Sequence, residues 1–199
     1  MAYTSALPSS RQGALTAGLP RRIAFGLAAT LVVAVAAHIA FPLPFTPVPL
    51  TLQPLAVLGV GLALGPVDGF FAMLAYLAEG AAGLPVFSPY PGLGGLAQLF
   101  GPTGGFLLAY PAVAFVAGGL TRHVQGHLGS FSAALVGCST ATLLLFMSGA
   151  CWLAHFAHFS AHAVWIAAVA PFLPGEAIKV VAASGVYRAL GPNHLSRSR

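Results

Sequence analysis

Residues 23–41 read IAFGLAATLVVAVAAHIAF, an apolar run that directly follows Arg21 and Arg22. A run of about 20 apolar residues is long enough to cross a bilayer as an α-helix, and it is too long for the core of a secretory signal. Four more such stretches and one shorter stretch follow along the 199-residue chain. The sequence therefore predicts an all-α integral membrane protein with six transmembrane helices.

The composition indicates the same fold class and argues against several functions. Hydrophobic residues make up 58% of the chain and charged residues only 6%, which leaves too few polar residues to cover a soluble fold. The net charge is +5, but the arginines never cluster beyond a pair, so the chain offers no basic face to a nucleic acid. Two separated cysteines, Cys138 and Cys151, indicate neither a disulfide framework nor a zinc motif. We expect no nucleic-acid partner, metal or cofactor.

Prolines and glycines divide the chain into helices and loops. Four prolines within residues 42–49 end the first span. Residues 83–101, rich in Gly, Pro and aromatics, are predicted to form an ordered loop against the bundle. Residues 154–171 are apolar but carry three histidines, which favours an interfacial helix outside the bundle. The helices are expected at residues 22–40, 52–64, 70–82, 103–120, 131–153 and 174–190. The predicted organisation is a flexible tail (1–20), a membrane domain (21–190) and a second tail (191–199).

The positions of the basic residues predict an orientation in the membrane. Six spans place both termini on one side, and short cytoplasmic loops are enriched in Lys and Arg. With the N-terminus inside, Arg22, the turn at 65–69, the Arg122 loop and the tail from Arg188 all lie on the inner side. The three outer segments then contain no Lys or Arg. We expect a multi-pass protein of the cell membrane with both termini and both tails in the cytoplasm.

Ionisable residues within membrane spans are costly and mark candidate functional sites. Asp68 lies in a predicted turn and is expected to be solvated. Glu79 is placed to reach the interface, to form a hydrogen bond in the bundle, or to bind a ligand. Glu176 and Lys179 are three residues apart on one helix face. This pair either neutralises itself or holds a cation and an anion ready for a bipolar solute.

Three histidines offer a second candidate site. His155, His158 and His162 recur at a spacing that places them on one side of a helix, as metal ligands require. They alternate with Phe156 and Phe159, and no carboxylate or cysteine nearby completes a ligand set. We interpret the segment as an amphipathic surface element. A metal-dependent membrane enzyme built on these histidines is the alternative.

The chain lacks the motifs of an enzyme or an energy-coupling machine. Its only lysine, Lys179, stands outside any phosphate-binding loop, so ATP hydrolysis of that type is excluded. Paired catalytic carboxylates and a nucleophile with its base are also missing. We therefore expect a binding protein without catalytic residues, whose energy comes from a partner.

Two pairs of small residues could allow another helix to approach closely. Ala24 and Ala28 are four residues apart in the first span, and Gly61 and Gly65 form a similar pair in the second. Small faces permit tight helix contacts in lipid. Each pair serves either a partner subunit or packing within the bundle.

Four motifs, in order, carry a resemblance to a known family. They are residues 46–55 (TPVPLTLQPL), 80–87 (GAAGLPVF), 101–106 (GPTGGF) and 171–179 (PFLPGEAIK). With these motifs, the chain from about residue 41 to 179 resembles the BioY family, the biotin-binding S component of energy-coupling factor (ECF) transporters. The resemblance implies a membrane subunit that captures biotin from outside and works with a transmembrane coupling subunit and two ATPases. It also implies that Ala24 and Ala28 contact the coupling subunit.

The resemblance also implies site residues. The family's last motif usually reads Asp-x-x-Lys, and its two charges belong to the biotin site. They correspond here to Glu176 and Lys179, so Glu replaces Asp, and Phe106 stands where the family usually has Tyr. The remaining expected ligand contacts are aromatic walls and hydrogen-bonding groups: Phe87, Tyr90, Phe106, Gln53, Gln98 and Thr103. An S component for a different vitamin is the alternative that the Glu176 replacement favours.

Overall fold

The computed structural model describes residues 9–191, which are mostly helical. The elements are α1 (Ser9–His38), β1 (Ala40–Phe41), β2 (Leu50–Thr51), α2 (Gln53–Leu64), α3 (Pro66–Ala81), α4 (Gly95–Leu99), α5 (Gly104–Val124), α6 (Ser130–Ala157), α7 (Ala161–Val164), the π-helix η1 (Trp165–Val169) and α8 (Leu173–Leu190). Strands β1 and β2 pair antiparallel and close the proline-rich segment into a loop.

In the part of the chain that the structure describes, three helices are long and apolar enough to cross a membrane. They are α5, α6 and the part of α1 from Gly18 to His38. Residues Ala161–Val169 and α8 form a fourth candidate, bent by 46° at a short break. Helix α2 has 12 residues and rises roughly 18 Å, less than the thickness of a hydrocarbon core. The described residues thus contain three to four apolar spans, and the count of six stays a prediction.

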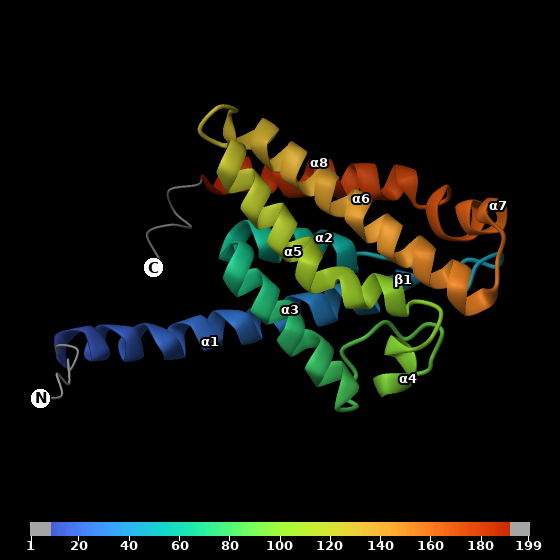
Figure 1. The fold of residues 1–199 in the computed structure, drawn as a ribbon, viewed down its shortest axis with the longest axis horizontal. Helices are drawn as coiled ribbons and strands as arrows, with labels where there is room; N and C mark the ends of the chain where they lie inside the picture. The colour runs from blue at the N-terminus through green and yellow to red at the C-terminus, as the bar shows by residue number, and fades with distance from the viewer. Residues whose placement is uncertain (1–8, 192–199) are drawn as a thin grey trace, which may run out of the picture.

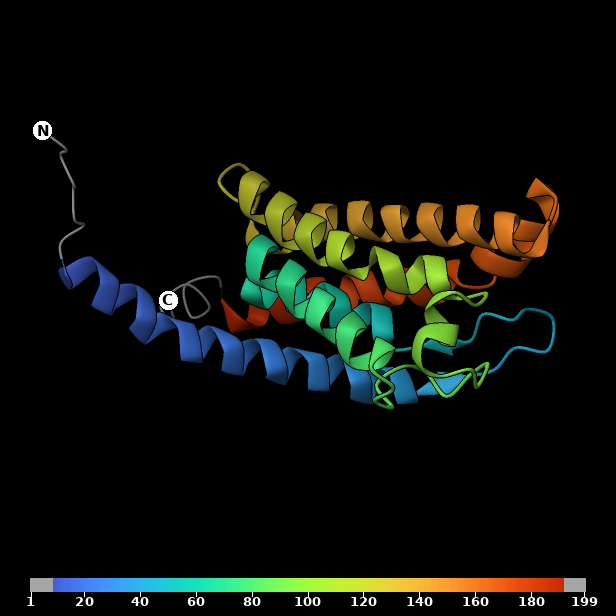
Figure 2. The same ribbon diagram turned by 60° about the horizontal axis from the view of Figure 1, so that its bottom comes forward.

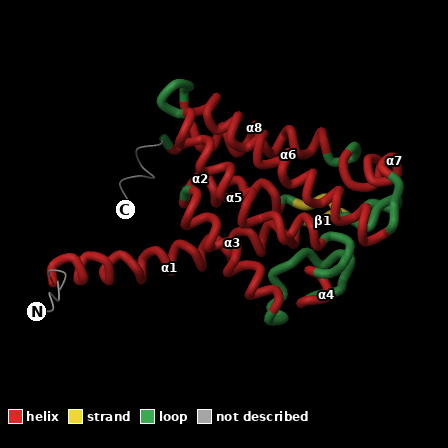
Figure 3. Tube along the Cα trace, viewed as in Figure 1, coloured by secondary structure: helices red, strands yellow, loops and turns green. Residues whose placement is uncertain are grey.

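The loops gather at one end of the bundle. Figure 1 shows the β1–β2 loop, α4 and α7 at the same end, whereas the α5–α6 connection and the last turn of α8 lie at the other. The tube in Figure 3 shows most of the loop residues at the first of these ends. Figure 2 shows α1 along the side of the bundle and extending beyond it. The proline-rich loop, the glycine-rich segment 83–101 and the histidine segment 154–171, which the predicted topology places on the outer face, therefore lie together.

Several helix boundaries differ from the predicted ones, and one short helix was not predicted. The segment 1–20, predicted to be a flexible tail, is helical from Ser9 onward, where good helix formers such as Ala, Leu and Arg prevail. Helix α3 begins at Pro66 rather than at residue 70, because proline fits the first turn of a helix. The segment 83–101, predicted to be a loop without a helix, contains the short α4.

The histidine segment packs against the bundle, and the prediction that it lies outside is wrong. Helix α6 continues to Ala157 before His158 ends it with a φ of 52°. Val164 and Ala168 are buried in a cluster with Leu153 and Phe172. The apolar side of α7 and η1 therefore faces the protein interior.

Helices α2 and α5 approach each other through glycines. A methyl group added at Gly61 would meet the Ala114 carbonyl, and one added at Gly118 would meet the Gly61 carbonyl. Only residues without a side chain allow backbones to come this close. Gly61, one of the second pair of small residues (Gly61 and Gly65), thus serves packing within the bundle.

Helix α1 is attached to α3 by two polar contacts. Arg22 forms an ion pair with Asp68 at the start of α3. The Thr30 hydroxyl lies 3.1 Å from the Glu79 carboxylate near the end of α3. Asp68 is therefore not simply a solvated turn residue, and the Glu79 carboxylate takes part in a hydrogen bond within the bundle.

Candidate ligand-binding site

A pocket opens among the loops at the β1–β2, α4 and α7 end of the bundle. It encloses about 590 Å³ of space between atoms, part of it open to solvent. Its lining residues are Val48, Pro49, Thr51, Gln53, Pro54, Ser88, Tyr90, Gln98, Thr103, Phe106, Leu107, Tyr110, Leu145, Phe146, Phe172 and Glu176. The walls therefore come from the proline-rich loop between β1 and β2, the glycine-rich loop between α3 and α4, and helices α2, α4, α5, α6 and α8.

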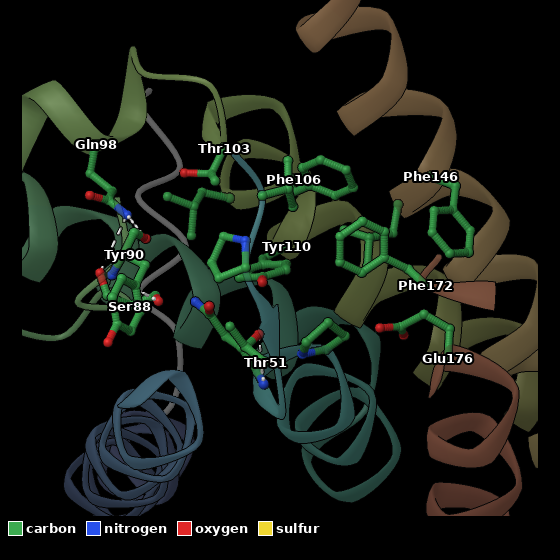
Figure 4. A pocket seen from close by; sticks show the side chains of 16 residues that line it. Thr51, Ser88, Tyr90, Gln98, Thr103, Phe106, Tyr110, Phe146, Phe172 and Glu176 are labelled. Atoms are coloured by element: carbon green, nitrogen blue, oxygen red, sulfur yellow. Dashed lines mark hydrogen bonds between the residues drawn. The ribbon is translucent and has the colours of Figure 1, made fainter. Parts of the chain in front are cut away.

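A buried ion pair borders the pocket on the α8 side. Glu176 and Lys179 are only 4% and 6% exposed, and Lys179 Nζ lies 2.5 Å from Glu176 Oε1. The other carboxylate oxygen, Oε2, is buried without a hydrogen-bond partner among the described residues. Glu176 lines the pocket, and in Figure 4 its carboxylate points toward it. The pair thus leaves one acceptor oxygen for a ligand donor.

One face of α5 forms the middle of the pocket wall. Thr103, Phe106 and Tyr110 recur at helical spacing and all line the pocket. The Thr103 hydroxyl is a second buried polar group without a partner among the described residues. Figure 4 shows Phe106 between Gln98 on one side and Glu176 on the other, with Phe172 and Phe146 on the side of Glu176. The pocket is therefore apolar in the middle and polar toward both sides.

The Gln98 side chain forms hydrogen bonds with the backbone of the glycine-rich loop, which forms the pocket wall on the side away from Glu176. Its Nε2 donates to the carbonyl of Tyr90 at 3.0 Å and lies 3.4 Å from that of Ser88. Its Oε1 accepts from the backbone N–H of Gly94 at 3.2 Å. Because its amide groups bind backbone atoms, Gln98 fixes the loop more than it presents free groups to a ligand.

Gln53 begins α2 and is almost fully buried at the pocket wall. Its Nε2 donates to the Tyr76 hydroxyl at 2.7 Å, and that hydroxyl donates to the Val86 carbonyl at 2.7 Å. A chain of two short hydrogen bonds therefore joins α2, α3 and the glycine-rich loop.

The structure brings most of the predicted site residues together. Those that line the pocket are Gln53, Tyr90, Gln98, Thr103, Phe106 and Glu176. Phe87 does not; it packs edge-on against the Tyr76 ring, with centroids 5.5 Å apart, and fills the space beside Gly80. Lys179 is not among the lining residues but borders the pocket through Glu176.

Several lining residues were not among those predicted from the sequence. Tyr110 is four residues after Phe106 on the same helix, so helical spacing from Thr103 could have identified it. Phe146 comes from α6, and no motif singles it out. Phe172 lies in the last of the four motifs, where only the charged positions drew attention.

The other candidate residues lie outside the pocket. Ala24 and Ala28 are exposed on α1, as are all three histidines on the histidine segment. Among the residues that the structure describes, no three His, Cys, Asp or Glu side chains come close enough to hold a metal ion. The histidine-based metal enzyme therefore finds no support in the described part of the chain.

Fold and pocket together define a multi-pass helical membrane protein with a partly enclosed pocket at one end. Comparison with known families identifies it further. The BioY family model matches residues 9–194. The chain belongs to the BioY family, which confirms the resemblance seen in the four motifs.

Individual relatives agree with this assignment. The chain is 37% identical to a probable biotin transporter BioY from Pyrococcus horikoshii over 69% of this chain and 76% of the relative. It is 36% identical to the biotin transporter BioY of Rhizobium etli over 82% and 89%, respectively. The crystal structure of the S-component for biotin from an ECF-type ABC transporter matches with a TM-score of 0.77 at 24% identity, covering 93% of this chain and 94% of that one. This last match shows that the fold is shared.

Proposed function

We propose that this chain is the substrate-binding subunit of a vitamin importer and that it captures biotin from outside the cell. The relatives named as biotin transporters support the substrate, and the fold shared with a biotin S-component supports the role. The observation that carries the proposal is the pocket with its buried Glu176–Lys179 pair.

The chemistry of biotin suits this pocket. Biotin has a carboxylate at one end, an apolar thiophane ring, and a ureido ring with two N–H donors and a carbonyl. The aromatic side chains of Phe106 and Phe172 offer apolar walls for the ring system. Glu176 Oε2 and the Thr103 hydroxyl are buried polar atoms without a partner in residues 9–191, and a ligand with complementary groups would satisfy both.

The proposed complex contains a transmembrane coupling subunit and two ATPases. The chain has no phosphate-binding loop, so the energy for uptake has to come from partners. Ala24 and Ala28 are exposed on α1, which lies at the side of the bundle, and so are accessible to another helix. We assign the contact with the coupling subunit to these two residues.

The ligand can be identified without assuming it. Protein purified in detergent from cells grown in rich medium is denatured, and the released small molecules are identified by mass spectrometry. We expect biotin at close to one molecule per chain. A different vitamin in the extract would support the alternative that Glu176 in place of Asp changes the specificity, and it would refute the biotin assignment. A panel of vitamins then ranks the affinities.

We also predict the orientation in the membrane from the arginines: Arg22 pairs with Asp68 at the start of α3, and Arg122 and Arg188 lie in the last turns of α5 and α8. Single cysteines are introduced at Pro47, Pro91 and His158 for the outer end and at Arg122 for the inner end, in a Cys138→Ser, Cys151→Ser background. Membrane-impermeant thiol reagents added to intact cells should label the first three positions and not the fourth. Labelling of position 91 only after the cells are opened would overturn this topology.

A further inference from the structure

The hydrogen bond between Tyr76 and Val86 fixes the direction of a buried proton chain. The Val86 oxygen is a backbone carbonyl and can only accept, so the Tyr76 hydroxyl has to donate its single proton there at 2.7 Å. The hydroxyl then has only lone pairs left for Gln53. Gln53 therefore has to turn its NH₂ group, and not its oxygen, toward Tyr76.

This direction determines what Gln53 presents to the pocket. An amide side chain carries one donor group and one acceptor atom at opposite corners. Because one N–H of the amide nitrogen is held by Tyr76, Oε1 is the acceptor that remains for the pocket, beside the second N–H of the same nitrogen. The Gln53 side chain is 3% exposed and lines the pocket, so its orientation is determined by the protein rather than by solvent.

We propose that Tyr76 is a positioning residue that locks the Gln53 amide with its oxygen toward the pocket, so that the site selects a ligand carrying an N–H donor. This inference rests on the proposed function, in which the donor is one of the two ureido N–H groups of biotin. Tyr76 itself is not a lining residue of the pocket. Its ring is completely buried against Phe87 and Tyr110, so its effect on specificity passes through Gln53.

The test compares biotin with two analogues in which one or the other ring NH is replaced by CH₂. The wild-type protein should bind one of the analogues about 10-fold more weakly than biotin, since that analogue leaves the Gln53 oxygen unpaired. In Tyr76→Phe the ring packing remains but the amide is free to turn. We expect this variant to lose about 10-fold in biotin affinity while its preference for biotin over that analogue falls to about 2-fold or less.

A structural role for Tyr76 would give a different pattern. If the hydroxyl only anchors the glycine-rich loop through Val86, its removal would weaken biotin and both analogues equally, and the unchanged preference would overturn the inference. A double-mutant cycle with Gln53→Leu adds a second criterion. Tyr76→Phe should cost no further affinity in the Gln53→Leu background, whereas additive losses would contradict an action through Gln53.

Tyr187→Phe is the matched control. Its hydroxyl donates to Oε1 of another glutamine, Gln125, at 2.8 Å. Tyr187 is in the last turn of α8 and Gln125 directly follows α5, and these two helix ends lie at the opposite end of the bundle. This variant should keep both the affinity for biotin and the preference. A wild-type protein that fails to bind biotin at all would refute the proposed function itself, so that failure is distinguishable from a failure of the Tyr76 inference.

Discussion

Lys179→Met is expected to lower the affinity for biotin by about 30-fold or more. The substitution keeps an apolar side chain of similar length and removes the cation that is paired with Glu176 at 2.5 Å in a buried position. Truncating one partner of a buried charge pair typically costs about 2 to 5 kcal/mol in binding, and about 2 kcal/mol corresponds to roughly 30-fold. Isothermal titration of purified protein in detergent measures the loss.

The double variant Lys179→Met, Glu176→Gln separates binding from stability. Lys179→Met alone leaves a buried carboxylate unpaired, which should also lower the thermal unfolding temperature. Replacing both charged groups removes that penalty, so the double variant should be monodisperse and stable. We expect it to remain unable to retain biotin. Recovered biotin binding would show that the two side chains only neutralise each other.

Ala24→Trp combined with Ala28→Trp is expected to abolish co-purification with the coupling subunit. Both alanines are exposed on α1, and two indole rings would hold a partner helix away from the small-residue face. Because neither alanine is part of the buried core, the variant should fold and still bind biotin. Affinity capture through a tag on this chain, followed by quantification of the coupling subunit, gives the result.

Leu143→Trp combined with Met147→Trp is the matched control for this experiment. These residues are 63% and 67% exposed on α6 and have the same spacing as the alanine pair. They add the same aromatic bulk to a different side of the bundle, so the coupling subunit should be retained. If the α1 double variant also retains it, the small-residue face is not the contact.

Helix positions were largely predictable because apolar runs are broken by strong local signals. Residues 52–64 and 174–190 agree with α2 and α8 to within one residue at either end, since a proline stands in the first turn of each helix. The start of α3 was missed because Gly65, Pro66 and Gly69 together suggest a turn, although Pro66 alone also suits a helix start.

The packing of the histidine segment could not be derived from its composition. Exposed residues such as His155 and Trp165 alternate with small buried ones such as Ala167 and Ala168, and this pattern is also typical of an interfacial helix. What decides the outcome is a contact between distant parts of the chain. The Thr46 hydroxyl bonds the Ala167 carbonyl at 2.5 Å and ties the π-helix to the proline-rich loop.

The ionisable residue of the candidate site could be predicted from the sequence, whereas the positions of its aromatic residues could not. Glu176 stands out in an apolar helix, so its place beside the pocket follows from the cost of burying a charge. Phe87 and Phe146 are both ordinary aromatic residues in apolar surroundings. Whether such a ring faces a ligand or another side chain depends on tertiary packing, which places Phe87 on Tyr76 and Phe146 in the pocket wall.

The pocket wall joins two parts of the chain that are separated by the connection between α5 and α6. Residues 48–110 supply one part of it, and residues 145–176 supply the other, including Glu176. A bound ligand would therefore act as a non-covalent cross-link between two halves of one polypeptide. A ligand that binds only the folded state stabilises it by about 2.7 kcal/mol when its free concentration is about a hundredfold above its Kd. The free concentration of the ligand would then determine how much binding stabilises the folded chain. The ligand-free chain would be the form most easily degraded.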